Sequence, residues 1–313
     1  SSTLSAIASS GLAVTFGSST EAVCTVAGST VSFLTVGTCT VTANQAGDDN
    51  YNAASQVTTN IAVAKADQTI TGLTADPAAG VVYGSSALRA AASSGLAVTF
   101  GSSTEAVCTV AGSTVTYLSA GTCTVTANQA GDDDYNAATQ VTTNITVAKA
   151  DQTISAFTAN PANGTVDGNS TLSATASSGL AVTFGSSTPA ICTVTGSTVT
   201  LIASGTCTVT ASQAGDDDYN AAPQVTLNIG VDKTDQTITG FAANPANGTV
   251  EGSSTLSATA SSGLAVTFES STPAICTVAG STVTFLDGGT CTVTANQAGD
   301  GDYNAAPQVT LNI

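Results

Sequence analysis

The sequence contains no histidine, and it has only 4 Lys and Arg residues against 21 Asp and Glu. Without histidine, the most frequent general base and a common zinc ligand are both missing. The formal net charge of −17 repels a nucleic-acid backbone or an anionic membrane surface. We therefore expect a protein that is not an enzyme, with no catalytic residue, no cofactor and no nucleic-acid partner.

Long apolar runs and aromatic side chains are also scarce. Ala and Val are scattered among Ser and Thr, and no apolar run approaches the 18 residues that a membrane-spanning helix needs. Phe and Tyr supply only 4% of the residues. The sequence therefore predicts no membrane insertion, and a thin hydrophobic core built mainly from Val, Leu, Ile and Ala.

Cysteine is present in four pairs of one spacing. Zinc sites usually need four Cys or His side chains close together, whereas each repeat here offers two Cys and no His, so disulfides are favoured over a metal site. Such bridges form in oxidising places, which predicts an extracellular or cell-surface protein. The expected disulfides are Cys24–Cys39, Cys108–Cys123, Cys192–Cys207 and Cys276–Cys291.

The sequence repeats itself with a period of 84 residues and no gap. The shift carries Cys24 onto Cys108 and Tyr51 onto Tyr135. This period is longer than the units of solenoid proteins and matches a small autonomous domain. We predict four modules, at residues 1–66, 67–150, 151–234 and 235–313.

Apolar and polar residues alternate with period two inside each module, as at Val225, Leu227 and Ile229. This alternation is typical of strands with one buried face, and no segment shows a helical stripe. The fold class predicted is all-β, with immunoglobulin-like (Ig-like) β-sandwich modules of about seven strands; a small barrel is the alternative. In the third module the pattern places strands at residues 153–157, 170–176, 181–184, 191–194, 197–202, 206–212 and 224–231.

The predicted last strand of one module is followed closely by the first strand of the next. Only residues 232–236 separate the two strands at the third junction. Because so short a connection leaves little freedom, we expect the modules to form an elongated rod.

Residues 37–54 read Gly-Thr-Cys-Thr-Val-Thr-Ala-Asn-Gln-Ala-Gly-Asp-Asp-Asn-Tyr-Asn-Ala-Ala, and a predicted strand follows at 56–63. This segment, which recurs four times, resembles the closing half of bacterial Ig-like repeat domains. The resemblance implies modules like those in the stalks of large bacterial surface proteins and adhesins. The cysteine pair here links the fourth and sixth predicted strands, so the antibody-type bridge between the second and sixth strands is not carried over.

The acidic loop before each repeated tyrosine is the strongest candidate for a site. Calcium needs six to eight oxygen ligands, and the alternative is a solvated turn in which Asp and Asn side chains bind their own backbone. Because the fourth loop has Gly301 where the others have an acidic residue, we favour the turn. The weak calcium candidates are Asp48, Asp132, Asp216 and Asp300, and the expected loop anchors are Tyr51, Tyr135, Tyr219 and Tyr303.

Three lysines occupy one repeat position, at Lys65, Lys149 and Lys233, each two residues before an Asp. An isopeptide cross-link is one interpretation, and a salt bridge at the module junction or simple exposure is the favoured one. Alternating threonines could bind glycans, but they are more simply the wet face of strands.

These observations predict a non-catalytic spacer in a bacterial extracellular fibre or surface stalk, whose partners are further copies of the same repeat. The alternative is a multivalent adhesin array in which each module binds a surface glycan or protein weakly. Ser1 aligns with Ser253, and Ile313 aligns with Ile61. We therefore expect the chain to be a window of a longer array, whose first module lacks the opening strand.

Overall fold

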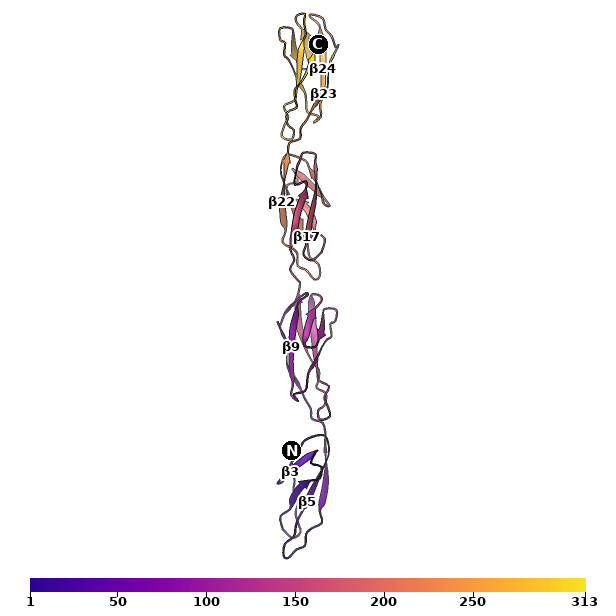
Figure 1. The fold of residues 1–313 in the computed structure, drawn as a ribbon, viewed down its shortest axis with the longest axis vertical. Helices are drawn as coiled ribbons and strands as arrows, with labels where there is room; N and C mark the ends of the chain where they lie inside the picture. Colours follow the sequence, from indigo (N-terminus) through magenta and orange to yellow (C-terminus); the bar gives the residue numbers. More distant parts are fainter. The chain divides into compact units, whose positions relative to one another are not determined.

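The computed structural model describes residues 1–313 and consists of strands, turns and loops. None of its segments forms a helix that could cross a membrane. The chain divides into two compact units, Ser1–Ala150 and Asp151–Ile313. Each unit contains two modules, and Figure 1 colours the four modules in chain order from indigo to yellow.

Module 3 shows the complete arrangement of strands. Its strands are β15 (Ile154–Asn160), β16 (Asn163–Thr165), β17 (Asn169–Ala176), β18 (Thr183–Ser186), β19 (Cys192–Thr195), β20 (Thr198–Leu201), β21 (Gly205–Ser212) and β22 (Val225–Asp232). One sheet has the order β15-β17-β20-β19, and the other has the order β16-β22-β21-β18. Figure 1 labels β17 and β22, one from each sheet. The prediction of tandem all-β sandwich modules is therefore confirmed.

Module 2 repeats this topology, with sheets β11-β12-β9-β7 and β10-β13-β14-β8. Its strands are β7 (Ile70–Asp76), β8 (Gly80–Val81), β9 (Ser85–Ala92), β10 (Thr99–Ser102), β11 (Cys108–Ala111), β12 (Thr114–Tyr117), β13 (Gly121–Asn128) and β14 (Val141–Ala148).

Modules 1 and 4 have fewer strands. Module 1 pairs the sheets β1-β4-β3 and β2-β5-β6, and module 4 pairs β23-β24-β27-β26 and β25-β28-β29. The strands of module 1 are β1 (Ser2–Thr3), β2 (Thr15–Ser18), β3 (Cys24–Ala27), β4 (Thr30–Phe33), β5 (Gly37–Asn44) and β6 (Val57–Val63). Those of module 4 are β23 (Ile238–Asn244), β24 (Ser253–Ala260), β25 (Thr267–Ser270), β26 (Cys276–Ala279), β27 (Thr282–Phe285), β28 (Thr292–Asn296) and β29 (Val309–Asn312).

The complete modules contain one strand more than the seven that the sequence pattern predicts. The additional strand, β16, is three residues long and runs parallel to β22, with Asn163 opposite Gly230 and Thr165 opposite Asp232. Its sequence, Asn-Gly-Thr, has no apolar alternation and begins with a dipeptide typical of turns. Strand periodicity therefore gives no signal there.

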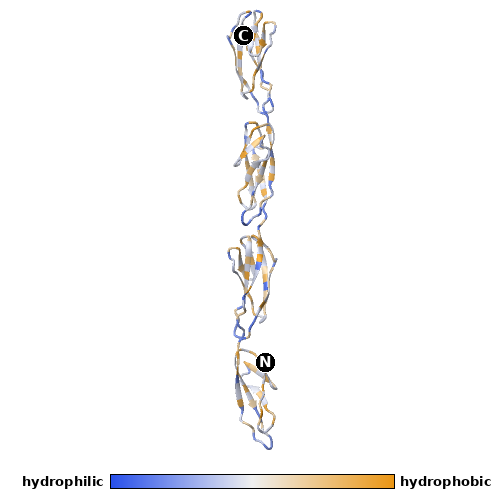
Figure 2. Cartoon of the chain, turned by 180° about the vertical axis from the view of Figure 1, so that it is seen from behind, coloured by the Kyte–Doolittle hydropathy of each residue, from blue (hydrophilic) through white to orange (hydrophobic).

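The core of each module lies between its two sheets. In β21, Cys207, Val209 and Ala211 are buried while the alternating Thr208 and Thr210 are partly exposed. Figure 2 shows the same mixture of hydrophobic and hydrophilic residues along the strands, with hydrophilic residues prominent in the loops. The alternation of Cys, Val and Ala with Thr thus builds a sandwich with few aromatic rings.

Module 1 has the smallest core. Its buried cluster consists of Cys24, Val31, Cys39 and Val41, and it contains no strand corresponding to β7, β15 or β23. The following residues, which align with β9, form only the two-residue strand β1. The residue at which each module ends and the next begins stays a prediction.

Candidate functional site at the module junctions

The disulfides connect the two sheets of every module. In module 3, Cys192 opens β19 of one sheet and Cys207 lies in β21 of the other, with 5.6 Å between their Cα atoms. Their side chains are buried, and no cysteine in the chain is free. The four bridges are Cys24–Cys39, Cys108–Cys123, Cys192–Cys207 and Cys276–Cys291.

The acidic loop folds around its first aspartate. Asp132 Oδ1 accepts hydrogen bonds from the backbone N–H groups of Asp134 and Tyr135, each at 2.9 Å. Gly131 enters the turn with φ of 77°, and a Cβ there would lie 2.3 Å from the Tyr135 carbonyl oxygen. The loop therefore depends on a glycine followed by an acceptor side chain.

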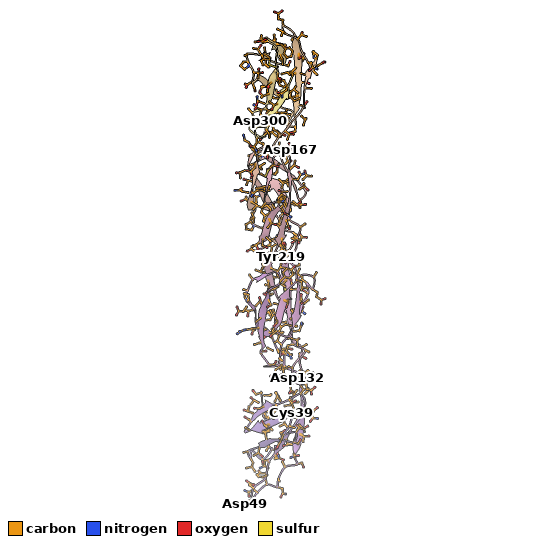
Figure 3. All side chains as sticks on the ribbon, turned by 45° about the horizontal axis from the view of Figure 1, so that its top comes forward. Cys39, Asp49, Asp132, Asp167, Tyr219 and Asp300 are labelled. Atoms are coloured by element: carbon orange, nitrogen blue, oxygen red, sulfur yellow. A yellow bond between two sulfur atoms is a disulfide. The ribbon has the colours of Figure 1, made fainter.

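The other three calcium candidates occupy the same turn. Asp48, Asp216 and Asp300 each accept two backbone N–H groups, including that of the following tyrosine. Figure 3 labels Asp49, Asp132 and Asp300 in these loops. No group of three or more His, Cys, Asp or Glu side chains is arranged to hold a metal ion. The geometry thus assigns these carboxylates to the turn.

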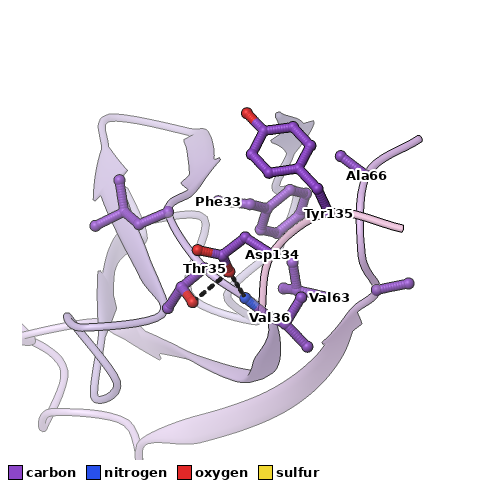
Figure 4. Close-up of a pocket in the computed structure, with 9 residues that line it drawn as sticks. Phe33, Thr35, Val36, Val63, Ala66, Asp134 and Tyr135 are labelled. Atoms are coloured by element: carbon purple, nitrogen blue, oxygen red, sulfur yellow. Dashed lines mark hydrogen bonds between the residues drawn. The ribbon is translucent and has the colours of Figure 1, made fainter. Parts of the chain in front are cut away.

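In unit 1, the acidic loop of module 2 contacts module 1. Asp134 Oδ1 accepts the Thr35 hydroxyl at 2.5 Å and the Val36 N–H at 2.8 Å, as Figure 4 shows. Its carbonyl oxygen accepts the Ala66 N–H at 2.8 Å. Ala66 also forms a parallel β-bridge with Tyr135. The loop of module 2 therefore forms the contact with module 1.

The lysine at the junction binds this loop as well. Lys65 Nζ donates to the carbonyl oxygen of Asp132 at 2.5 Å. Asp67 instead accepts a hydrogen bond from Asn136 Nδ2 at 2.9 Å. Both side chains are therefore directed to the loop of module 2, and Lys65 is exposed.

Unit 2 contains the same junction between modules 3 and 4. Asp302 Oδ1 accepts the Ser204 N–H at 2.7 Å, and Lys233 Nζ donates to the Asp300 carbonyl oxygen at 2.5 Å. Thr234 forms a parallel bridge with Tyr303, as Ala66 does with Tyr135. Two separately folded units thus use the same contacts at equivalent positions.

The role of the repeated tyrosines as loop anchors stays a prediction, and the structure shows an additional contact for one of them. Tyr303 donates its hydroxyl hydrogen to Asp167 Oδ2 of module 3 at 2.7 Å. Tyr51, in the loop of module 1, leaves 54% of its surface exposed. Tyr219 donates its backbone N–H to Asp216. In unit 2 the ring of Tyr303 therefore serves the junction between modules.

Hydrogen bonding shifts the pKa values of two side chains at the junctions. The Thr35 hydroxyl and then the Val36 N–H lower the pKa of Asp134 below its ordinary value of 3.8, with a smaller contribution from the charge of Lys65. The hydrogen bond to Asp167 raises the pKa of Tyr303 above 10.0, and burial and the nearby carboxylates add to this rise. The junction thus favours an ionised Asp134 and a neutral Tyr303.

A pocket of 380 Å³ lies beside the junction in unit 1 (Figure 4). Phe33, Leu34 and Val63 line it together with Asp134 and Tyr135. Its carboxylate already accepts two hydrogen bonds, and its remaining lining is mostly apolar. The arrangement pairs no nucleophile with a base.

Sequence reasoning missed a buried glutamine at the start of modules 2, 3 and 4. Gln68 donates to Gln129 Oε1 at 2.5 Å and to the Asn136 carbonyl oxygen at 2.7 Å, and it accepts the Ser94 hydroxyl at 2.5 Å. Gln152 and Gln236 occupy the equivalent buried positions. The recurring Asp-Gln-Thr-Ile at residues 67–70, 151–154 and 235–238 was the available signal.

No family model matches this sequence, and no curated protein does either. Among solved structures, the chain is similar to EC1-4 of Drosophila N-cadherin, with 11% identity, coverage of 99% of this chain and 93% of that chain, and a TM-score of 0.25. It is also similar to FdeC, an adhesin of Escherichia coli, with 17% identity, 78% and 96% coverage, and a TM-score of 0.24.

A third similar structure is that of domains 1-6 of surface layer protein SbsC, with 16% identity and a TM-score of 0.24. The match covers 97% of this chain but only 48% of that one, so the chain spans about half the length of the SbsC fragment. These similarities are of fold class alone.

Proposed function

We propose that this chain is a non-catalytic, load-bearing spacer in a bacterial extracellular fibre or surface stalk. The observation that carries the proposal is the repeated junction, in which a loop carboxylate binds a backbone N–H of the preceding module at Val36 and again at Ser204. In both units, the backbone carbonyl oxygen of the first loop aspartate accepts a hydrogen bond from a lysine of the preceding module. A chain whose repeated polar groups serve the joints between modules is suited to spacing.

The strand topology supports resistance to tension. In module 3, the second strand β16, which follows the first strand β15, and the last strand β22 are parallel neighbours. Val166 N–H donates to the Asp232 carbonyl oxygen at 3.1 Å, and Gly230 N–H donates to Asn163 Oδ1 at 3.0 Å. Once tension reaches β16 and β22, it draws these parallel strands past each other, and their evenly spaced hydrogen bonds are loaded together. A sheet loaded in this way resists more force than a sheet whose hydrogen bonds break one after another.

The disulfides support an extracellular location. All eight cysteines are bridged, and such bridges persist in oxidising compartments. They also close a 15-residue separation in each module, which stabilises a thin core by roughly 3 kcal/mol. A spacer outside the cell requires this protection against unfolding.

Electron microscopy of the native material tests this function. The proposal predicts filaments or stalks that bind antibodies raised against the 313-residue chain along their length. Labelling confined to a compact particle, or to the tip of a stalk, would contradict a spacer role.

A second candidate function is a multivalent adhesin, and one repeated surface feature favours it. Leu34, Leu118, Ile202 and Leu286 occupy one repeat position and are exposed by 56%, 43%, 44% and 49%. One weak contact per module would gain strength through avidity. Replacing all four with Ser should abolish binding to host cells or glycan arrays if the adhesin function is correct, whereas a spacer should show no such binding with or without the substitutions.

A further inference from the structure

A shallow groove recurs along the chain, beside the turn that joins β11 to β12 in module 2 and beside the equivalent turns. In module 2 the groove measures 330 Å³ and is lined by Val98, Thr99, Phe100, Gly112 and Ser113. Modules 1 and 4 contain it at the same repeat positions, with volumes of 330 and 320 Å³. Module 3 has the same residue types, at Val182, Thr183, Phe184, Gly196 and Ser197. The groove is therefore a property of the repeat, present in the complete module 2 as in the others.

The groove is partly apolar and carries no charge. Val98 and Phe100 are partly buried and form its apolar part, whereas Thr99, Gly112 and Ser113 are exposed around it. A Cβ atom built on Gly112 would meet no atom within 4 Å, so the space above the turn is open. No charged side chain lines the groove in module 1, 2 or 4. Because burying a charge there would be costly, the groove is suited to an apolar side chain.

One exposed aliphatic side chain per module matches this groove in number and in chemistry. It directly follows β12 or its equivalent, and its backbone is fixed, since the Leu118 N–H donates to the Val107 carbonyl oxygen at 2.8 Å. We call these four side chains the knobs: Leu34, Leu118, Ile202 and Leu286. Knobs and grooves thus both recur with the period of 84 residues.

A module cannot place its knob in its own groove. In module 2 the groove lies at the turn before β12, and Leu118 lies beyond the other end of this strand. Four strand residues at about 3.3 Å each separate the two by roughly 13 Å. None of the grooves in modules 1, 2 and 4 is lined by any knob of the chain. An apolar occupant must therefore come from another molecule, and a second copy of this chain supplies one for each groove.

We propose that copies of this chain associate side by side, with the knobs of one copy inserted into the grooves of the next. The contact is heterologous, because the two copies use different surfaces, so that further copies can add and build a bundle. A single knob contributes little, but several contacts with the same period gain strength through avidity. The net charge of −17 opposes the association, and salt strengthens it by screening this repulsion. This property goes beyond the spacer function and does not depend on it.

Sedimentation of the 313-residue chain and of two complementary variants tests the proposal. The knobless variant carries Leu34→Ser, Leu118→Ser, Ile202→Ser and Leu286→Ser. The blocked variant places a charge at the rim of every groove, with Ser29→Glu, Ser113→Glu, Ser197→Glu and Ser281→Glu. A matched control adds the same four charges outside the groove lining, with Thr25→Glu, Thr109→Glu, Thr193→Glu and Thr277→Glu. All these positions are exposed, so the variants should fold, which circular dichroism checks.

The natural chain should form assemblies that grow with protein concentration. They should also grow as salt rises from about 0.15 M to about 1 M, because the Debye length falls from about 8 Å to about 3 Å. The control should assemble in the same way. Leu118→Ser alone should weaken the association roughly tenfold, as the loss of one buried leucine predicts.

The knobless and blocked variants should each remain monomeric. Mixed in equal amounts, they should associate again, because the first supplies only grooves and the second supplies only knobs. A natural chain that stays monomeric at high salt, or a mixture that stays monomeric, would overturn the proposal. Association of the blocked variant alone would overturn it as well, because knobs would then be contacting something other than the grooves.

Discussion

Asp134 Oδ1 accepts the Thr35 hydroxyl at 2.5 Å, although the two residues belong to different modules and are 99 positions apart in the sequence. The same oxygen accepts the Val36 N–H at 2.8 Å. One carboxylate of module 2 therefore satisfies two donors of module 1. Its equivalent, Asp302, accepts the Ser204 N–H at 2.7 Å in the other unit.

Replacing Asp134 with Ala should loosen the junction without unfolding either module. The Val36 N–H loses its acceptor, so we expect its hydrogen exchange to accelerate by about tenfold, the equivalent of one charge-assisted hydrogen bond. The neighbouring Asp133→Ala is the matched control, because that side chain is exposed. Equal exchange at Val36 in the two variants would show that Asp134 does not hold the junction.

Acid should weaken the same junction. The pKa of Asp134 is lowered by its contact with Thr35, so the contact stabilises the junction fully above the ordinary value of 3.8. This stabilisation is lost as the pH falls through the lowered pKa. Amide exchange at Val36, corrected for the intrinsic effect of pH, should report the loss in the natural sequence. In the Asp134→Ala chain the corrected exchange should be flat, and a parallel decline there would assign the effect to other carboxylates.

Base should weaken the junction in unit 2. The pKa of Tyr303 is raised by its hydrogen bond to Asp167, so this contact is fully present below the ordinary value of 10.0. It is lost as the pH rises through the raised pKa, because two negative charges then face each other. Phenolate absorbance should show one tyrosine titrating late, and this component should disappear in Asp167→Asn. Its persistence in that variant would contradict the assignment.

Gln68→Ala should destabilise module 2 by about 2 kcal/mol, because it removes the buried hydrogen bonds of Gln68 to Gln129 Oε1, to the Asn136 carbonyl oxygen and to the Ser94 hydroxyl. Hydrogen exchange of β9 should report this loss locally. Gln140→Ala is the control, because that glutamine is exposed and donates its side-chain hydrogen bond to Asn128 Oδ1 at the surface. Similar effects of the two substitutions would mean that burial of Gln68 contributes little.

The fold was predictable from the sequence because its signals are local. Alternation at Val225, Leu227 and Ile229 predicts a strand whatever surrounds it. The contact of Asp134 with Thr35 was not predictable, since nothing in strand periodicity fixes how one module meets the next. The strand β16 was missed for a related reason: its pairing with β22 depends on backbone placement, and its Asn-Gly suggests a turn.

Pulling single molecules by their two ends tests the load-bearing account most directly. The account predicts separate unfolding events, one per module, because each module has its own core and its own disulfide. Under oxidising conditions each event should release roughly 50 Å less chain than after reduction, since the bridge retains 15 residues at about 3.6 Å each. A single cooperative event, or release lengths that reduction does not change, would contradict independent, disulfide-locked modules.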